Sequence, residues 1–477
     1  MRVLERVETT PEQKRLLESF RLGPTVVRGA AGSGKTTVCL MRLDGMCATM
    51  ASRFRRQGRT DRVRALVLTF NKTLSAYVRR LTEVSNFSPA ASAVDLEVAT
   101  FAQWACARSG IGRVAENECR AELRALCVEA DLPYDLTFLL GELDYLTGRF
   151  PPAQLHRYIS AKRDGRGSKP RVDGPRRQQI LDRIVTPYQA WKTEKGLADW
   201  NDVAVATARE PGEKGYDVIV VDEAQDFSAN QLRTIASHCN DAHSMTIILD
   251  TSQRIYARGY TWKELGLVIH SGHSWRLHIS YRNTAQIAHF VAGLLRGLET
   301  DDDGTVADPG ECNRQGPMPL ALVGDLWQQL RYVRRFLRER VDLRHESAAF
   351  LHPGGGRWFE PILKMLREEG IKPAVLTKAS VWPEDGDNIA CCTLSSAKGL
   401  EFDHVILLDM QPRAFELGPG ISTQDADMDD AEMTRLRRLL GVGFSRARQS
   451  IIFGYDPTNA TRLLECLDPA TYEQEYL

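Results

Sequence analysis

The sequence predicts an α/β protein with two parallel-sheet domains in tandem and a helical insertion in the first domain. Short runs rich in valine, isoleucine and leucine alternate with amphipathic segments along most of the chain, as expected of strands buried between helices. Residues 104–198 break this alternation, because their apolar residues follow helical periodicity alone. We therefore expect a first domain over 1–103 and 199–275, an insertion over 104–198, and a second domain over 276–477.

The composition of the chain limits the classes of function that it can have. The 477 residues are 43% hydrophobic and 26% charged, which is typical of globular proteins with several buried cores. Because 62 Lys and Arg balance 62 Asp and Glu, a nucleic-acid site would have to be a local basic groove. The ten cysteines lack zinc-site spacing, which predicts buried thiols in a reducing compartment. With no signal-peptide pattern and no apolar run of about 18 residues, we expect a cytoplasmic protein without a membrane partner.

A glycine-rich loop near the N-terminus predicts nucleoside triphosphate binding. Gly29–Thr36 fits the pattern G-x-x-x-x-G-K-[ST] at every position, between a predicted strand at 25–27 and a predicted helix from Thr37. The glycines allow a tight turn whose N–H groups point at phosphate, Lys35 supplies a charge, and the Thr36 hydroxyl can hold Mg²⁺. The residues predicted to bind ATP here are Gly29, Gly32, Gly34, Lys35, Thr36 and Thr37.

Before this loop, Thr10 and Gln13 have the spacing of a helix capping box. Gln13 therefore has two equally supported roles, a local one in the cap and a functional one in which its amide reads the adenine edge. After the loop, predicted strands at 65–70 and 96–100 lead to Phe70, Asn71 and Thr100. Ligand groups gather at such strand ends in an open α/β sheet.

Two further buried strands, at 216–221 and 245–250, end in polar residues. The first leads into Asp222 and Glu223, which predicts that Asp222 binds Mg²⁺ and that Glu223 polarises the attacking water. The second leads to Gln253, whose neutral amide could sense a γ-phosphate and orient water. Arginine and aromatic residues follow from Arg254 to Trp262, and such residues can stack on and neutralise a single strand.

The second half repeats the strand–helix alternation without a phosphate loop. Strands are expected near 277–284, 320–323, 347–351, 374–376, 389–394, 404–409 and 450–455, the last closing the sheet, and residues 411–432 are expected to form an acidic loop. Arg282 and Arg446 lie at strand–helix junctions. Either could deliver a guanidinium to the transferring phosphoryl group, but the spacing alone favours a local role, in which each arginine caps a helix or pairs with a nearby carboxylate.

Together these stretches resemble the UvrD/Rep-like branch of superfamily 1 helicases. The motifs occur in the family's order as Thr10–Gln13, Gly29–Thr36, Thr69–Lys72, Thr100-Phe101, Asp222–Asp226, Leu249–Tyr256, Ser280–Thr284, Thr393–Phe402 and Val442–Arg448. The family's Thr-Phe-His is Thr-Phe-Ala here, and its fifth motif has Ser395 where histidine is common. Larger family members carry a second insertion, the 2B subdomain, between the fourth and fifth motifs. Here the interval between Thr284 and Thr393 is filled by predicted ordinary strands and helices, so we expect this insertion to be missing.

The resemblance implies two RecA-like domains, ATP and Mg²⁺ as cofactors, and 3′→5′ movement along a single strand. It implies that Arg282 and Arg446 reach the γ-phosphate, and that Glu223 and Gln253 complete the catalytic set. Glu401 would approach the ribose. The implied nucleic-acid contacts are Phe70, Asn71, Thr100, Tyr256, Arg258 and Thr393.

Two functions remain open at the level of the sequence. The first is a nucleic-acid-stimulated ATPase that translocates on single-stranded DNA, in preference to RNA, and unwinds short duplexes. The second is an ATP-dependent clamp or switch that regulates a protein partner such as a nuclease, with little unwinding. A phosphate-loop kinase would leave the second half and its arginines without a purpose.

Overall fold

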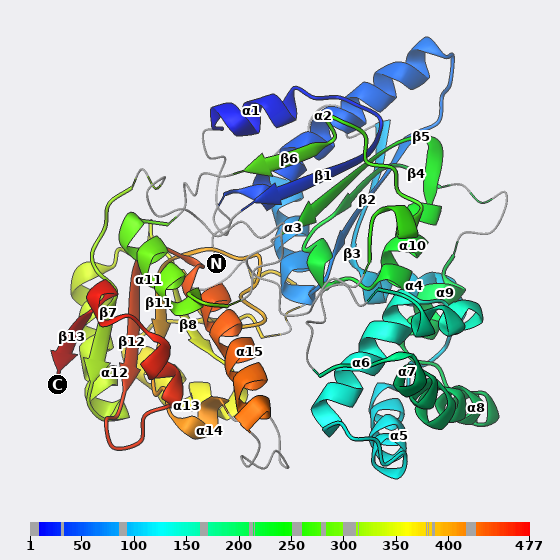
Figure 1. The fold of residues 1–477 in the computed structure, drawn as a ribbon. Helices are drawn as coiled ribbons and strands as arrows, with labels where there is room; N and C mark the ends of the chain where they lie inside the picture. Colours follow the sequence, from blue (N-terminus) through cyan, green and yellow to red (C-terminus); the bar gives the residue numbers. More distant parts are fainter. Residues whose placement is uncertain are drawn as a thin grey trace.

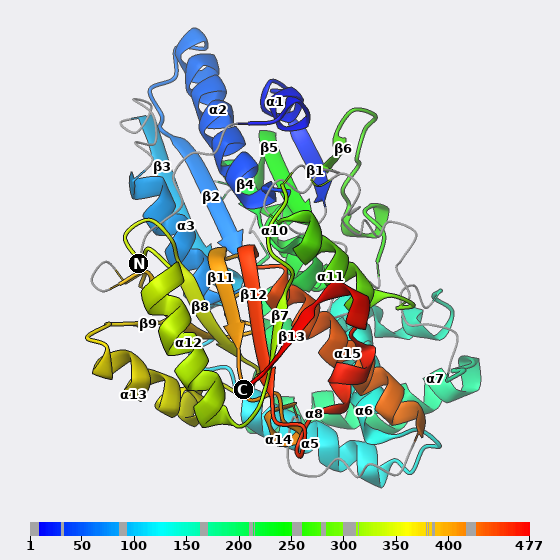
Figure 2. The same cartoon turned by 90° about the vertical axis from the view of Figure 1, so that its left-hand side faces the viewer.

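The computed structural model describes residues 9–29, 33–84, 93–162, 170–208, 213, 215–249, 260–277, 283–298, 312, 314–377, 379, 381–383, 387–415 and 426–477. Its strands form two sheets in which every neighbouring pair is parallel, one of six strands and one of seven (Figures 1 and 2). This confirms the predicted α/β class with tandem RecA-like sheets.

The first sheet has the strand order β3-β2-β4-β5-β1-β6. Alternate strand residues enter different cores, because Val27 and Val220 pack in one cluster with helices α2 and α3, whereas Val26 and Ile219 pack in another with α4, α9 and α10. The strands are β1 (Gly23–Gly29), β2 (Val63–Thr69), β3 (Val94–Thr100), β4 (Tyr216–Val221), β5 (Cys239–Leu249) and β6 (Ser274–Leu277). The helices are α1 (Pro11–Leu17), α2 (Lys35–Arg56), α3 (Lys72–Val84), α4 (Phe101–Ser109), α9 (Trp200–Ala206) and α10 (Ala229–Ser237).

A separate group of helices lies beside the first sheet, as Figure 1 shows in cyan to green. It consists of α5 (Glu116–Glu129), α6 (Leu136–Arg149), α7 (Gly174–Ile180), a π-helical segment (Leu181–Val185) and α8 (Thr186–Lys195). Most of its apolar side chains form a core of their own. An ion pair of 2.7 Å between Arg149 and Glu264, and a hydrogen bond from Asn230 to the Thr147 carbonyl, fix the group to the first domain.

Two predicted domain boundaries fall inside elements of the first domain. The boundary at 103/104 divides α4, whose Trp104 is buried in the core of the first sheet. The boundary at 275/276 divides β6, which pairs with β1. We therefore propose that the insertion starts after α4 and that the first domain extends to Leu277.

The second sheet has the strand order β13-β7-β12-β11-β8-β10-β9. Its strands are β7 (Leu320–Val323), β8 (Ala348–His352), β9 (Ala374–Val375), β10 (Ile389–Thr393), β11 (Phe402–Leu407), β12 (Ala447–Tyr455) and β13 (Glu473–Tyr476). Helices α11 (Ala285–Leu295) and α15 (Ala426–Phe444) pack near one face, where Phe290 contacts Phe444 and Phe453. Helices α12 (Leu326–Arg340) and α13 (Glu360–Glu368) supply the opposite core.

Two expectations for this domain are wrong. The strand at 450–455 does not close the sheet, because β12 lies inside it and β13 forms the edge beyond β7. The region 411–432 is not simply a loop, since it contains α14 (Pro412–Phe415) and the start of α15 at Ala426.

Helix α3 of the first domain contacts the second domain directly. The Tyr77 and Trp382 rings lie edge to face with centroids 5.1 Å apart, and the Thr73 hydroxyl donates to the Leu376 carbonyl at 2.9 Å. A Cβ at Gly399 would lie 2.7 Å from a methyl group of Leu74, so glycine permits this close approach. The two domains therefore meet through a packed interface formed by α3 and loops of the second domain.

Candidate active site at the carboxyl edge of the first sheet

The predicted phosphate-binding loop lies between β1 and α2 in the chain. Gly34 has φ +73°, a left-handed conformation that favours glycine, and it precedes the first residue of α2. A Cβ at Gly29 would lie 2.5 Å from the Ser33 hydroxyl oxygen and 3.0 Å from the Leu277 carbonyl oxygen, so a larger residue would be crowded here. Among the described residues, the buried Ser33 hydroxyl has no hydrogen-bond partner. Gly32 lies outside the described residues.

Three polar side chains meet where this loop faces the end of β4. The Lys35 ammonium donates to the Gly29 carbonyl at 2.8 Å, and the Thr36 hydroxyl donates to an Asp222 carboxylate oxygen at 2.8 Å. Burial, and secondly the charge of Glu223, raise the pKa of Asp222 to about 7. Thr37 follows in the first turn of α2. An amine, a hydroxyl and a buried carboxylate at a helix N-terminus fit a triphosphate with Mg²⁺, whose protein ligands are usually few because phosphates and waters supply the rest.

Glu223 is held in an unusual backbone conformation. Its φ is +54°, which is costly for a non-glycine residue and is concentrated at functional sites in proteins. Its side chain is buried, accepts a hydrogen bond from Gln225, and has one oxygen 3.6 Å from the Lys398 ammonium. The predicted water-polarising residue is therefore fixed by neighbours from both domains.

Gln13 occupies the local role predicted for it and also touches the phosphate loop. Its backbone N–H donates to the Thr10 hydroxyl, and its side-chain oxygen accepts from the Thr10 N–H, which completes a capping box. Its amide nitrogen donates to the Ser33 carbonyl at 2.9 Å. Gln13 thus links α1 to the loop, and adenine reading stays a prediction.

Arg446 lies in the turn between α15 and β12 and is buried. Its guanidinium donates to the Val442 carbonyl at 2.9 Å and to the Ser445 hydroxyl at 3.1 Å. The Asn283 amide donates to the carbonyls of Ser445 and Ala447, at 3.1 Å and 2.6 Å, and so clamps the chain on both sides of Arg446. Asn283 directly follows Arg282 in the sequence.

Of the remaining residues predicted to contact the nucleotide, one lies among the described residues and two do not. Glu401 is half-buried in the segment that precedes β11. Gln253 and Arg282 lie outside the described residues, so their roles stay predictions.

The predicted nucleic-acid contacts differ in accessibility. Phe70 is 46% exposed and packs edge to face on Phe227, which leaves ring surface for stacking. Asn71 is half-buried at the start of α3. Thr393 is buried, and its hydroxyl is bonded within the turn to Ser396. Tyr256 and Arg258 lie outside the described residues.

Thr100 is the most buried of the predicted nucleic-acid contacts that the structure describes. It is 2% exposed, and its hydroxyl caps α4 by accepting from the Gln103 N–H at 3.2 Å. A contact with a nucleic-acid strand stays a prediction for Thr100, as it does for the buried Thr393. The hydroxyl serves the helix cap because Gln103 completes a capping box there.

Sequence reasoning missed Asn283, Lys398 and Asp226 as site residues, although all three lie in or beside the motifs. Lys398 is buried and its ammonium donates to an Asp226 carboxylate oxygen. These two residues are 172 positions apart, so no local pattern could have connected them. The one local feature that could have indicated a role for Lys398 is its position in the turn after the buried strand β10.

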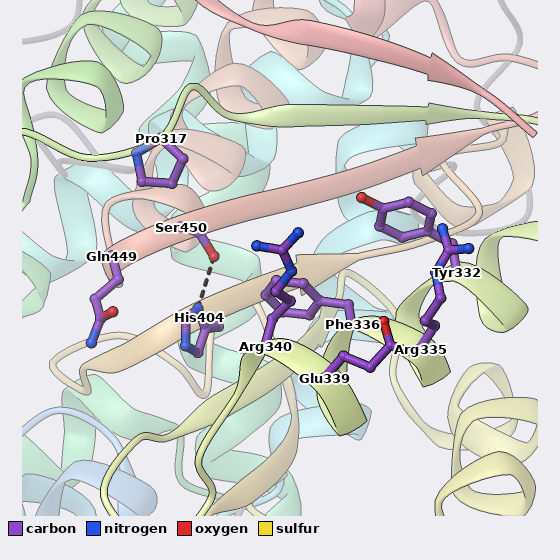
Figure 3. A pocket seen from close by; sticks show the side chains of 9 residues that line it. All are labelled: Pro317, Tyr332, Arg335, Phe336, Glu339, Arg340, His404, Gln449 and Ser450. Atoms are coloured by element: carbon purple, nitrogen blue, oxygen red, sulfur yellow. Dashed lines mark hydrogen bonds between the residues drawn. The ribbon is translucent and has the colours of Figure 1, made fainter.

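A cavity of about 510 Å³ lies apart from these residues, between α12 and the amino ends of β11 and β12 (Figure 3). His404 and Ser450 meet across neighbouring strands through a 2.8 Å hydrogen bond, and burial lowers the pKa of His404. Figure 3 shows the side chains from α12 along one side. The lining residues are Pro317, Tyr332, Arg335, Phe336, Glu339, Arg340, His404, Gln449 and Ser450, and none is a predicted site residue.

The described part of the chain contains neither a metal-binding cluster of side chains nor a membrane-spanning helix. No group of three or more histidine, cysteine, aspartate or glutamate side chains is arranged there to hold a metal ion. None of the helices in that part is both long enough and apolar enough to cross a membrane.

Comparison with known proteins agrees with the sequence motifs. The family model described as the UvrD/REP helicase N-terminal domain matches residues 9–260, which is more than half of the chain. No curated protein matches the sequence. Among solved structures, the C-terminal domain of a possible DNA helicase from Lactobacillus plantarum WCFS1 is 22% identical. That match covers 41% of this chain and 98% of the other, with a TM-score of 0.29, a value too low to bear on function.

Proposed function

The chain belongs to the UvrD/Rep helicase family, and we propose that it is an ATPase stimulated by single-stranded nucleic acid, DNA in preference to RNA. We further propose that it translocates 3′→5′ and unwinds short duplexes. The observation that carries the proposal is the meeting of Lys35, Thr36 and Asp222 at the carboxyl edge of the first sheet, next to a packed interface with the second.

Each residue has a role that follows from its position. Lys35 would exchange the Gly29 carbonyl for phosphate oxygens, and Thr36 and Asp222 are the side chains that would hold Mg²⁺. Mg²⁺ held at this position would neutralise charge on the phosphates. Glu223 accepts a proton from the attacking water, in a conformation fixed by Gln225 and Lys398. Arg446 leaves its bonds to Val442 and Ser445 and contributes positive charge from the second domain.

On the nucleic-acid side, Phe70 offers an exposed aromatic face for base stacking. Asn71 directly precedes α3, the helix that contacts the second domain, so a strand bound there would touch both domains. Motion of one domain against the other during ATP turnover would then shift the strand.

A second candidate is an ATP-dependent clamp that regulates a protein partner such as a nuclease. It is favoured by the compact second domain, because the described residues between Thr284 and Thr393 are elements of that domain, with no further domain among them. A clamp would close on a strand without displacing its complement.

Strand displacement separates the two candidates. The substrates are duplexes with a 3′ tail or a 5′ tail, and ATP hydrolysis is measured in parallel without nucleic acid and with matched DNA or RNA single strands. Displacement of 3′-tailed duplexes supports the helicase, and stimulated hydrolysis without displacement supports the clamp. Lys35→Ala is the inactive control. Absence of hydrolysis by the wild-type chain under every condition would refute both.

A further inference from the structure

A lysine of the second domain contacts two carboxylates of the acidic turn after β4. Asp222, Glu223 and Asp226 lie within five residues; Asp222 is 2% exposed, and the side chains of Glu223 and Asp226 are 6% and 5% exposed. Lys398 comes from the turn between β10 and β11 of the second sheet and is 4% exposed. Its ammonium donates to Asp226 and lies 3.6 Å from Glu223. Buried carboxylates in such a cluster depend on a nearby cation.

The backbone of Lys398 is itself held against the first domain. The Asn71 amide donates to the Lys398 carbonyl at 3.4 Å, and Gly399 approaches Leu74 so closely that a Cβ there would clash. Its turn begins at Thr393, whose hydroxyl bonds to Ser396. One short turn thus connects two residues predicted to contact nucleic acid, Asn71 and Thr393, with the predicted water-polarising Glu223.

We propose that Lys398 is a positioning residue that makes ATP hydrolysis depend on the docking of the second domain and on the bound strand. When the domains are docked, the ammonium holds Glu223 and Asp226 in their strained turn, with Glu223 ready to accept a proton. When the domains separate, Glu223 loses this support, and hydrolysis slows although ATP still binds. The proposal rests on the proposed ATPase function and names how that activity is regulated.

The variants Lys398→Gln, Asp226→Asn and the double variant test the proposal in the full-length chain. Lys364→Gln is the control, because Lys364 is an exposed lysine of the same domain, on α13. Steady-state kcat and KM for ATP are measured with and without a single-stranded DNA oligonucleotide. Thermal unfolding of each variant shows whether it is folded.

We expect Lys398→Gln to lower DNA-stimulated kcat about tenfold or more, while KM for ATP changes less than about threefold. Because the two side chains act together, the double variant should lose no more than the worse single variant. Lys398→Arg keeps the charge and should recover part of the stimulation. The Lys364→Gln control should behave as wild type.

Unchanged stimulation in folded Lys398→Gln would overturn the proposal, and so would losses that multiply in the double variant. An equal loss of kcat in Lys398→Arg and Lys398→Gln, or a change in KM alone, would also overturn it. If the wild-type chain hydrolyses no ATP, the proposed function fails instead, so the two failures are distinguishable.

Discussion

Replacing Glu223 by glutamine removes one charge from the buried acidic turn while keeping the shape of the side chain. A general base contributes roughly 10²–10⁴ in rate, which corresponds to about 3–5 kcal/mol of the activation barrier. The glutamine oxygen can still accept the hydrogen bond from Gln225, so the turn keeps this contact. We therefore expect kcat to fall by roughly this factor while ATP binding remains.

The effect of Glu223→Gln on stability has a sign that the structure determines. The pKa of Asp222 is higher in the folded protein than in the unfolded chain. The carboxyl therefore stabilises the fold at a pH below its pKa in the unfolded chain, and this stabilisation is lost as the pH rises toward about 7. Removing the charge of Glu223 reduces this loss, whereas the 3.6 Å contact with Lys398 is weakened. The two effects oppose each other, so the free energy of unfolding at neutral pH should stay within about 1 kcal/mol of wild type.

The assay for Glu223→Gln combines phosphate release with binding of a fluorescent ATP analogue in the presence of Mg²⁺. Gln231→Glu, a change of similar size on α10, controls for an altered charge in the same domain. Turnover within about threefold of wild type would refute the role of Glu223 as the proton acceptor. Loss of ATP binding together with turnover would show that the side chain acts on the nucleotide instead.

Three further predictions concern the remainder of the site. Lys35→Ala should abolish ATP-driven activity in hydrolysis assays, since it removes the charge that meets the phosphates; measurable stimulated turnover would contradict this. Asn283→Ala leaves two buried carbonyls without its amide, so it should lower both the free energy of unfolding, by about 2–3 kcal/mol, and kcat. Asn388→Ala, which removes an amide bonded to the Leu343 carbonyl, is the control and should leave kcat unchanged. A loss of stability with full kcat in Asn283→Ala would limit Asn283 to a structural role. Because the pKa of Asp222 is about 7, protons should compete with Mg²⁺ below that pH and raise its half-saturation about tenfold between pH 8 and pH 6, after correction for the nucleotide alone; a flat profile would contradict this.

Local chemistry made the first half of the site predictable. The phosphate loop, the Thr10–Gln13 cap and the acidic turn after β4 each depend on residues a few positions apart, and the hydrogen bond between Thr36 and Asp222 joins the two side chains predicted to hold Mg²⁺. Thr100 shows the limit of such reasoning, because the same hydroxyl can cap a helix or face a ligand. Its surroundings decide between these, and they are not local in sequence.

Long-range contacts account for most of the other differences. The sequence of β13, Glu-Gln-Glu-Tyr, has no apolar run, and the strand joins the sheet by backbone pairing with β7. Lys398 and Asp226 meet only because the domains pack together. Apolar periodicity predicts which segments are buried, but it does not predict which turn of one domain faces which turn of the other.

The turnover of Arg446→Ala tests most directly the claim that the second domain completes the ATP site. Arg448→Ala is the matched control, since that arginine lies two residues further on, is 26% exposed, and pairs with Asp403 at 3.5 Å. A guanidinium at the transferring phosphoryl group is worth roughly 10³–10⁵ in rate. We predict a loss of about this size in DNA-stimulated hydrolysis by Arg446→Ala, with ATP affinity nearly unchanged and with Arg448→Ala close to wild type. Wild-type turnover in folded Arg446→Ala would contradict the account.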